Sequence, residues 1–312
     1  MAYNLKEVMN KPERLTGGQR MCAGCGGPIA VRTVLRALKP EDHAVICSAT
    51  SCLEVSTFLY PYTAWTDSFI HSAFENAAAT ISGVEAAYQV LHRKGKVKET
   101  YKFIAFGGDG GTYDIGFQSL SGAMERGHDM VYVCYDNGAY MNTGIQRSSA
   151  TPHFADTTTT PIGSASNGKM QSKKDLVAIM AAHNIPYVAQ STFIGNMKDL
   201  YEKAEKAIYT EGAAFLAVMA PCPRGWRYSE EKMMKICKLA VETCYWPLYE
   251  VVNGEWKLSY KPKNKLPITE FLKEQGRFKH LFKKGNEHLL EQFQAEVDLR
   301  WERLLKRCGE EA

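Results

Sequence analysis

The chain has 312 residues, of which 45% are hydrophobic and 23% are charged, and a formal net charge of +4. This composition is that of a globular protein with one or two α/β domains, and the charge is too small to indicate a nucleic-acid partner. The apolar runs have the length of strands rather than of membrane-spanning helices. The first fifteen residues, MAYNLKEVMNKPERL, contain no apolar region of the kind found in a secretory signal, which predicts a cytoplasmic location.

In chain order, the elements predict a parallel α/β fold. A polar arm (1–20) precedes a helix at 27–38 and a buried strand at 43–50. Further helices are predicted from helical spacing at 72–95, 115–127, 173–184, 197–212 and 230–244, and further buried strands at 101–111, 129–138, 185–192 and 213–222. Strand, glycine turn, helix and strand follow one another between 101 and 138. This βαβ unit predicts a parallel sheet with helices on both faces and ligands at the carboxyl ends of the strands.

Three regions are expected from this pattern: the arm, an α/β domain over 21–245, and a C-terminal extension over 246–312. The extension contains a basic segment, 255–285, with nine Lys or Arg against three Glu, and ends in a charged amphipathic helix. The segment is either a solvated face or a surface that binds an acidic partner. A long Gly-, Ser- and Thr-rich stretch, 139–170, is predicted to be a functional loop.

Polar residues follow two neighbouring strands of the predicted sheet. Asp109 lies in the turn GGDGG after one strand, and Asn137 follows the next strand, 28 residues later. A carboxylate, an amide oxygen and a backbone carbonyl make half of an octahedral Mg²⁺ site that phosphate oxygens and water complete. A chance glycine turn is the structural alternative, but the spaced Asn and the following NTG favour a cofactor site, because GDG followed by Asn at this spacing resembles thiamine diphosphate enzymes.

Nine cysteines are present, and two of them, Cys22 and Cys25, form a CxxC motif. Cys52 and Cys222 each follow a buried strand, at the sheet edge where a cofactor would bind. Four thiolates at separate loop ends suit either an iron–sulfur cluster or zinc, and the spacing leaves both open. Cys134, Cys237 and Cys244 lie in apolar patterns and are predicted to be core residues.

Several motifs in family order resemble the β subunit of pyruvate:ferredoxin oxidoreductases. They are CAGCG (22–26), YPYTAW (60–65), HSAFENAAA (71–79), GGDGGTYDIG (107–116), YMNTGIQRSSATP (140–152) and APCPRGW (220–226). The resemblance implies an oxidoreductase subunit that binds thiamine diphosphate, Mg²⁺ and a [4Fe–4S] cluster. The implied reaction is oxidative decarboxylation of a small 2-oxoacid, such as pyruvate with coenzyme A, with electrons passing to ferredoxin.

The resemblance also implies roles for individual residues. The cluster ligands would be Cys22, Cys25, Cys52 and Cys222, and the Mg²⁺ ligands Asp109, Asn137 and the carbonyl of Ala139. Cofactor-binding residues would be Gly108, Asp109, Gly110, Gly111, Asn137, Ala139, Asn142 and Thr143, and substrate-adjacent catalytic candidates Thr50, Asp114 and Asn142. Asp114 has a second interpretation as the N-cap of the 115–127 helix. His71, His153 and His183 are assigned no role.

The implied partners are an α subunit, γ/δ-type subunits and ferredoxin. The glutamate that activates the cofactor is expected from the α subunit and not from Glu75. The sequence departs from the family pattern at Ser51, at Gly138 and at 153–156, and the last two changes make oxalate, cleaved without coenzyme A, an alternative substrate. The sequence is also compatible with a non-redox thiamine lyase and with a zinc-stabilised scaffold subunit.

Overall fold

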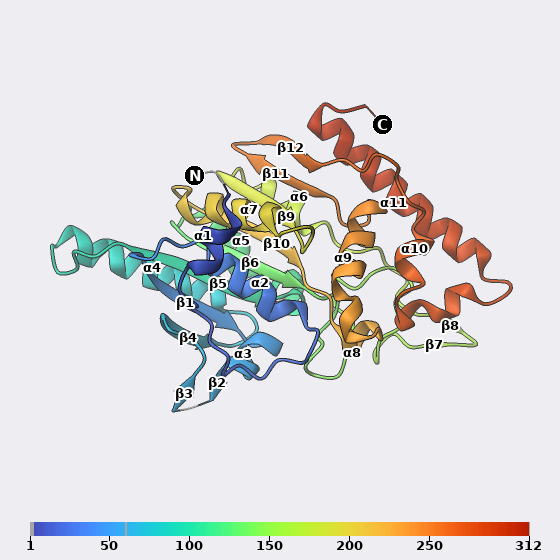
Figure 1. Cartoon of the computed structure of the whole chain (residues 1–312), viewed down its shortest axis with the longest axis horizontal. Coiled ribbons are helices and arrows are strands. Elements are labelled where there is room, and N and C mark those ends of the chain that lie inside the picture. Colours follow the sequence, from blue (N-terminus) through green and yellow to red (C-terminus); the bar gives the residue numbers. More distant parts are fainter. Residues whose placement is uncertain (1–2, 60, 312) are drawn as a thin grey trace.

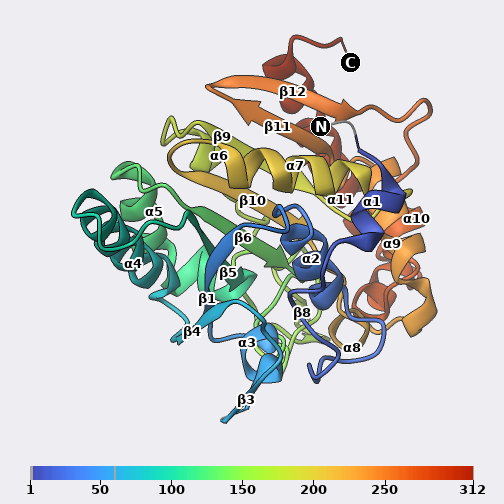
Figure 2. The same ribbon diagram turned by 60° about the vertical axis from the view of Figure 1, so that its left-hand side comes forward.

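An eight-stranded sheet runs through the computed structural model of the chain, which describes residues 3–59 and 61–311. Its strand order is β12-β11-β9-β10-β6-β5-β1-β4, and the strands from β9 to β4 are parallel (Figures 1 and 2). The strands are β1 His43–Ala49, β4 Ser68–Ser72, β5 Tyr101–Gly108, β6 Val131–Asp136, β9 Tyr187–Ser191, β10 Ala214–Met219, β11 Leu248–Val252 and β12 Glu255–Tyr260. Two small hairpins pair β2 Phe58–Leu59 with β3 Tyr62–Thr63, and β7 Ile162–Gly163 with β8 Ser166–Asn167.

Helices cover both faces of the parallel strands, as predicted. The connections β4–α4–β5, β5–α5–β6 and β6–α6–β9 advance in one direction along the sheet, whereas β9–α7–β10 returns. Because such crossovers are right-handed, α4, α5 and α6 lie on one face and α7 lies on the other, beside α2. The helices of this part are α2 Gly26–Leu35, α3 Cys52–Thr57, α4 Ala77–Arg93, α5 Phe117–Glu125, α6 Leu176–Ala181, α7 Lys198–Tyr209, α8 Pro223–Trp226 and α9 Met233–Glu242.

The central strands are covered on both faces, so every residue of β6, β9 and β10 is buried. This is why their sequences are near-continuous apolar runs rather than alternating patterns. Cys134, Cys237 and Cys244 are all buried, which confirms their predicted place in the core. Among the described residues no helix has both the length and the apolar character that crossing a membrane requires.

The structure differs from the predicted elements at two places in the N-terminal half. The arm is not simply extended, because it contains helix α1 (Leu5–Asn10) and a fully buried Leu15, and Arg14 pairs with Asp67 at 2.6 Å. The helix predicted from residue 72 begins at Ala77, because the preceding residues of β4 pair with the edge of β1. Pairing at the sheet edge satisfies backbone groups that a longer helix would leave open on β1.

The C-terminal extension continues the same sheet. Strand β11 pairs antiparallel with β9, and β12 pairs with β11, where the sequence pattern predicts only an extended piece. The chain then forms α10 (Thr269–Leu272), the 3₁₀ helix η3 (Gly276–Phe282) and the predicted long helix α11 (Glu287–Cys308). Helix α11 packs on β12 and η3 (Figure 1). Two more short helices, η1 (Gly111–Ile115) and η2 (Glu230–Lys232), complete the elements.

Candidate active site at the carboxyl edge of the sheet

Two cysteines and two polar residues lie at one edge of the sheet, each just after one of four adjacent strands. The neighbours β1, β5, β6 and β10 are parallel, so their carboxyl ends meet there. Cys52 follows β1 by three residues, Asp109 follows β5 directly, Asn137 follows β6 directly and Cys222 follows β10 by three residues. The prediction that these residues share an edge is therefore confirmed by the topology.

Three oxygen atoms converge beside the end of β6. The side-chain oxygen of Asn137 lies 2.9 Å from the carbonyl oxygen of Ala139 and 2.9 Å from Oδ1 of Asp109. Adjacent ligands of an octahedral Mg²⁺ at 2.0–2.1 Å are about 2.9 Å apart, so these two separations match those between adjacent ligands. Turning the Asn137 amide over would replace the contacts by two hydrogen bonds. The flipped amide suits the metal-free protein, whereas a bound cation would favour the orientation that turns the amide oxygen toward Ala139 and Asp109.

The protein holds the carboxylate of Asp109 in a fully enclosed position. Its Oδ2 accepts a hydrogen bond from the hydroxyl of Ser148 at 2.6 Å, and Oδ1 accepts one from the backbone N–H of Asn137 at 3.2 Å. Burial, and next the neighbouring carboxylate of Asp136, raise the pKa of Asp109 to about 7. A buried carboxylate without a cation is costly, and a bound metal ion would remove this cost.

A second network fixes the backbone between the metal-ligand candidates. Lys173 pairs with Oδ2 of Asp136 at 2.5 Å, and the hydroxyl of Tyr113 donates to the same oxygen at 2.8 Å. Oδ1 of Asp136 accepts from the N–H of Gly138 at 3.1 Å. Gly138 has φ +77°, a left-handed conformation that favours glycine.

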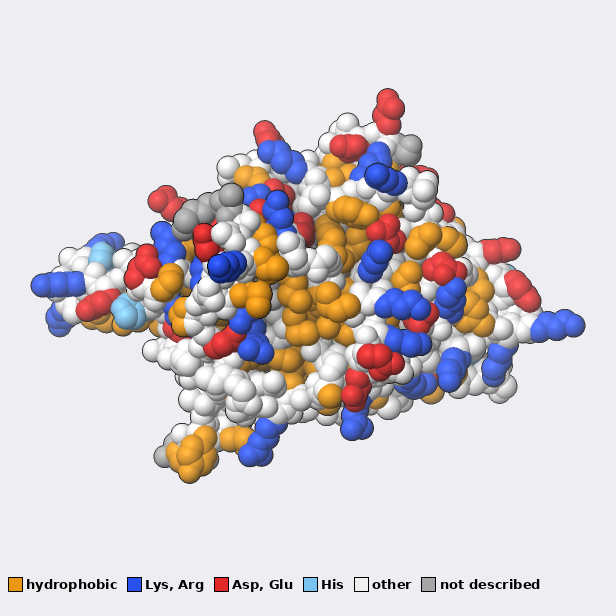
Figure 3. All heavy atoms as spheres, viewed as in Figure 1, with side chains coloured by type: hydrophobic (Ala, Val, Ile, Leu, Met, Phe, Trp, Pro, Cys, Tyr) orange, Lys and Arg blue, Asp and Glu red, His pale blue; other side chains and the backbone are white. Residues whose placement is uncertain are grey.

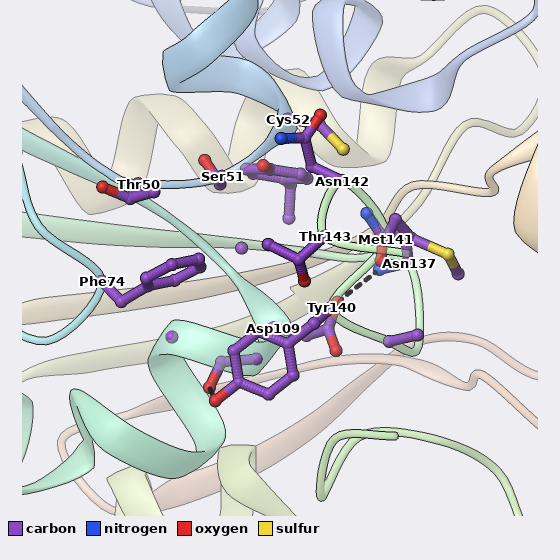
Figure 4. A pocket seen from close by; sticks show the side chains of 15 residues that line it. Thr50, Ser51, Cys52, Phe74, Asp109, Asn137, Tyr140, Met141, Asn142 and Thr143 are labelled. Carbon is purple, nitrogen blue, oxygen red and sulfur yellow. Dashed lines mark hydrogen bonds between the residues drawn. The ribbon is translucent and has the colours of Figure 1, made fainter. Parts of the chain in front are cut away.

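A cavity opens beside these oxygens (Figure 4). It occupies about 350 Å³ including its mouth, and all eight predicted cofactor-binding residues line it. Figure 4 shows Thr50, Ser51 and Cys52 on one side, with Asp109 and Tyr140 opposite. The full lining is Thr50, Ser51, Cys52, Phe74, Gly108, Asp109, Gly110, Gly111, Tyr135, Asn137, Ala139, Tyr140, Met141, Asn142 and Thr143.

Of the three catalytic candidates, Thr50 and Asn142 line the cavity and Asp114 does not. The carboxylate of Asp114 accepts hydrogen bonds from the backbone N–H and the hydroxyl of Ser149, so it ties η1 to the loop after β6. Its interpretation as a helix N-cap is wrong, because α5 is preceded by Gly116 without any side-chain cap. The residues at 153–156 are also absent from the cavity lining.

The three histidines without an assigned role all contact structural partners. His71 pairs with Glu54, His153 pairs with Glu296 at 3.0 Å, and His183 hydrogen-bonds Ser121 at 2.7 Å. None of these pairs includes a residue that lines the cavity.

Four of the five cysteines that are not fully buried, Cys22, Cys25, Cys52 and Cys222, lie near one another, and Cys52 lines the cavity. Burial is the main cause that raises the pKa of Cys25 and of Cys52 to about 12, and in both cases the other thiols of the group raise it further. Cys22 is exposed, and the other three are half-buried. Among the described residues, no three His, Cys, Asp or Glu side chains are placed to hold a single metal ion. The thiols are therefore close enough to interact, without converging on one point.

Helix starts support two of these thiols. Cys25 is the N-cap of α2, and its sulfur accepts from the N–H of Gly27 at 3.4 Å. Cys222 is the N-cap of α8, and its sulfur accepts from the N–H of Gly225 at 3.3 Å. Backbone N–H donors at a helix start stabilise a thiolate. These donors offset part of the effect of burial, which raises the pKa of both thiols.

Gly26 sets the distance between the CxxC loop and the segment after β10. Its N–H donates to the carbonyl of Pro221 at 3.1 Å, and an added Cβ would lie 2.9 Å from backbone atoms of Ala220. We expect Gly26→Ala to destabilise the protein by about 1–3 kcal/mol and to lower the iron content of anaerobically purified protein. Gly17→Ala is the control, because a Cβ at Gly17 meets nothing within 4 Å. Equal denaturation midpoints for the two variants would contradict the expectation.

A buried lysine holds the loop after β6 in place through hydrogen bonds to its backbone. Lys169 has no exposed surface, and its ammonium donates to the carbonyls of Thr151 (2.5 Å), Ser149 (3.4 Å) and Ser172 (3.4 Å). Burial, followed by the charges of Arg147 and Lys173, lowers the pKa of Lys169 to about 7. Lys169 was not predicted from the sequence, where it lies in a polar stretch without a distinctive pattern.

This lysine gives the stability of the protein a pH dependence. Between pH 7 and 10.5 the unfolded chain keeps a proton on Lys169 that the folded protein releases. The free energy of unfolding of the wild type should therefore rise with pH in this window, by up to about 1.4 kcal/mol per pH unit, relative to Lys169→Met. Chemical denaturation at several pH values measures the difference, with the exposed Lys263→Met as the control. Parallel pH profiles for wild type and Lys169→Met would contradict it.

Other residues of the site were missed by sequence reasoning. The indole N–H of Trp226 donates to the backbone carbonyl of Asn137 at 2.5 Å, and the hydroxyl of Tyr140 donates to that of Gly110 at 2.8 Å. Ser148, which contacts Asp109, and Lys173, which pairs with Asp136, were not predicted either. Trp226 lies four residues after Cys222, which was a usable signal, whereas Ser148 and Lys173 gave none.

Several known proteins resemble this chain in sequence or in fold. The model of the C-terminal thiamine pyrophosphate-binding domain of thiamine pyrophosphate enzymes matches residues 47–218. The chain is 51% identical to the pyruvate synthase subunit PorB of Thermotoga maritima, over 98% of its own length and 96% of the relative's. It is 43% identical to the ketoisovalerate oxidoreductase subunit VorB of Pyrococcus furiosus, over 97% and 96%. The 2-oxoglutarate:ferredoxin oxidoreductase from Magnetococcus marinus superposes with a TM-score of 0.57 over 76% of this chain and 81% of that chain, at 20% identity, which shows a common fold.

Proposed function

The chain belongs to the family of the pyruvate synthase subunit PorB, and on this basis we propose that it is the thiamine diphosphate-binding subunit of a 2-oxoacid:ferredoxin oxidoreductase. The proposal includes a Mg²⁺ ion and one [4Fe–4S] cluster on this chain. The observation that carries it is the convergence of Asp109, Asn137 and the carbonyl of Ala139 at the same sheet edge as four thiols.

Mg²⁺ would be held by Oδ1 of Asp109, the amide oxygen of Asn137 and the carbonyl of Ala139. The 2.9 Å contacts between these oxygens and the enclosed carboxylate support this assignment. When bound, thiamine diphosphate supplies a carbon nucleophile for the keto carbon of the substrate and an electron sink for the loss of CO₂. Gly110 and Gly111 line the cavity at the end of β5, where we expect the diphosphate to bind. The absence of side chains lets the ring of Tyr140 and the carbonyl oxygen of Phe74 pack against them, at 2.4 and 2.8 Å from where a Cβ would lie.

The residues around the cavity position the reactants and exclude water. Tyr140 packs against Gly110, where an added Cβ would lie 2.4 Å from its ring, and closes the cavity below the metal-ligand candidates. Phe74 forms an apolar wall, and Thr50 and Asn142 supply polar atoms for a substrate carboxylate. The hydroxyl of Thr50 donates to the carbonyl of Ser72 at 3.0 Å, so its oxygen can still accept a hydrogen bond.

We assign Cys22, Cys25, Cys52 and Cys222 as the ligands of a [4Fe–4S] cluster, which would accept electrons one at a time. Mutual effects on pKa indicate that the thiols lie near one another, while no three of them are arranged around a single ion among the described residues. This combination favours a cluster over one zinc ion. Because Cys52 also lines the cavity, the electron path from the cofactor would be short.

Partner subunits are expected to cover the open side of the cavity. The hairpin β2–β3 protrudes from the body next to α3 and carries an apolar tip, visible in Figure 3. Its residues Leu59 and Tyr62 are 37% and 79% exposed. Exposed apolar groups of this kind mark contact surfaces. We propose that the α subunit binds here and supplies the glutamate that activates the cofactor.

We also propose that the basic segment 255–285 contacts a further subunit.

Substrate-dependent reduction of a low-potential dye tests the proposed function. The complex is purified anaerobically and given pyruvate, ketoisovalerate, 2-oxoglutarate or oxalate, each with and without coenzyme A. We expect reduction with pyruvate only when coenzyme A is present to capture the acetyl group. Reduction by oxalate without coenzyme A would instead establish oxalate as the substrate. A complex that contains thiamine diphosphate but reduces the dye with none of these substrates would contradict the proposed function.

A further inference from the structure

Arg277 is a buried cation next to the candidate active site, without a carboxylate partner. Its side chain is 2% exposed, and its Nε donates to the side-chain oxygen of Gln275 at 2.9 Å. Its Nη2 is buried and has no hydrogen-bond partner within the described part of the chain. Burial lowers the pKa of Arg277 only to about 10, so the guanidinium stays charged at neutral pH. A buried, unpaired charge is too costly to be incidental.

The backbone holds this guanidinium in a fixed place. The N–H of Gly276 donates to the carbonyl of Arg227 at 3.1 Å, and the carbonyl of Arg277 accepts from the N–H of Asp156 at 3.1 Å. A Cβ on Gly276 would lie 2.7 Å from the Cβ of Arg227, so glycine permits η3 to approach α8 this closely. The guanidinium then stacks on the ring of Trp226, 4.0 Å from its centroid.

In that position Arg277 contacts residues that adjoin both proposed sites. Trp226 belongs to the short helix that Cys222 caps, and its indole N–H reaches the carbonyl of Asn137. A Cβ on Gly138 would come 3.1 Å from Nη1 of Arg277. Arg277 is therefore close to the thiol group as well as to the metal-ligand backbone.

The carboxylates around Arg277 already have other partners. Asp136 pairs with Lys173 at 2.5 Å, and Asp156 pairs with Arg227 at 2.7 Å. Asp109 is assigned to the metal ion. The phenol of Tyr245 also faces the guanidinium, but burial raises its pKa to a value that keeps it neutral at pH 7. With Mg²⁺ bound to Asp109, a further negative group would be available to Arg277 at the helix that Cys222 caps, where the guanidinium stacks on Trp226 and a cluster with thiolate ligands would lie.

We propose that Arg277 is a positioning residue for electron transfer, whose fixed positive charge stabilises the reduced state of the cluster at Cys22, Cys25, Cys52 and Cys222. This inference rests on the proposed function, because it requires the cluster. One-electron reduction adds one negative charge to the cluster, and a buried cation nearby makes that step more favourable. Arg277 thereby makes the cluster a better acceptor for electrons that leave the substrate.

The test is a redox titration of the full chain, produced anaerobically and followed by electron paramagnetic resonance. We expect Arg277→Gln to reduce the ratio of reduced to oxidised cluster roughly tenfold at a fixed potential, which is a shift of about 59 mV to more negative potential. Arg277→Lys keeps the charge and should leave the potential close to that of the wild type. Arg224→Gln is the matched control, because it removes an exposed charge two residues from Cys222 and should shift the potential far less.

The outcomes separate this inference from the proposed function. A wild-type chain without a cluster would remove the cluster from the proposed function and this inference with it. An intact cluster with an unchanged potential in Arg277→Gln would overturn the inference alone. If Arg277→Gln fails to fold, Arg277→Lys tests the inference instead. In this charge-conserving variant, a shift in potential of about 59 mV or more would show that the positive charge is not what sets the potential.

Discussion

Asp109→Asn is expected to abolish turnover of a 2-oxoacid while leaving the metal-free protein folded. The amide offers one neutral oxygen in place of a charged carboxylate, so affinity for Mg²⁺ and thiamine diphosphate should fall on the order of 100-fold or more. The amide oxygen can take the place of Oδ1 and accept from the N–H of Asn137, while the amide nitrogen, in the place of Oδ2, can donate to the hydroxyl oxygen of Ser148. Isothermal titration with thiamine diphosphate and Mg²⁺, together with dye reduction, measures both losses.

The stability of this variant is expected to change in the opposite direction. Without a metal ion, Asp109 is a buried carboxylate whose pKa burial raises to about 7, and it is mostly ionised at pH 8. Removing the charge should therefore raise the free energy of unfolding of chelator-treated protein at pH 8 by roughly 1–3 kcal/mol. A higher denaturation midpoint than that of the wild type would show this gain. Asp114→Asn serves as the control, since Asp114 lies outside the cavity lining and should leave cofactor affinity nearly unchanged. Full cofactor affinity in Asp109→Asn would contradict the assigned metal site.

Cys222→Ser is expected to remove the cluster and to reduce electron transfer to the dye by at least about 100-fold. Serine is a good N-cap, so the hydroxyl can accept from the N–H of Gly225 and preserve α8. The variant should therefore keep its fold and its affinity for thiamine diphosphate, which isolates the loss of one sulfur ligand. Electron paramagnetic resonance after dithionite reduction and circular dichroism are the measurements.

A second cysteine gives a matched control for this variant. Cys308 is half-buried near the end of α11 and is not among the four proposed ligands. Cys308→Ser should leave both the resonance signal and the activity at wild-type levels. A full cluster signal in Cys222→Ser would show that Cys222 is not a ligand.

Local sequence pattern predicted the parts of the site that lie at strand ends. Asp109 and Asn137 directly follow buried strands, and a parallel sheet brings such positions together without any knowledge of side-chain packing. The same reasoning placed Cys52 and Cys222 at this edge. The roles of Cys22 and Cys25 came from the family resemblance, and the structure adds the contact from Gly26 to Pro221 that brings them close.

The supporting residues could not be predicted in this way, because their contacts join distant segments. Ser148 is 39 residues from Asp109, Trp226 is 89 residues from Asn137, and Lys173 is 37 residues from Asp136. No periodicity or spacing encodes such pairs. Strands β4 and β11 were missed for a related reason, since they are short and are defined by their pairing with β1 and β9 rather than by their own pattern.

We expect this one chain to bind thiamine diphosphate and a four-iron cluster side by side. The most direct measurement counts iron, acid-labile sulfide, zinc and thiamine diphosphate in the chain produced anaerobically without its partners, so that every atom counted is bound to this chain. We predict four iron and four sulfide per chain, with thiamine diphosphate retained in the presence of Mg²⁺. One zinc per chain with neither iron nor thiamine diphosphate would contradict the account and favour a scaffold subunit. Thiamine diphosphate without iron would favour a non-redox lyase.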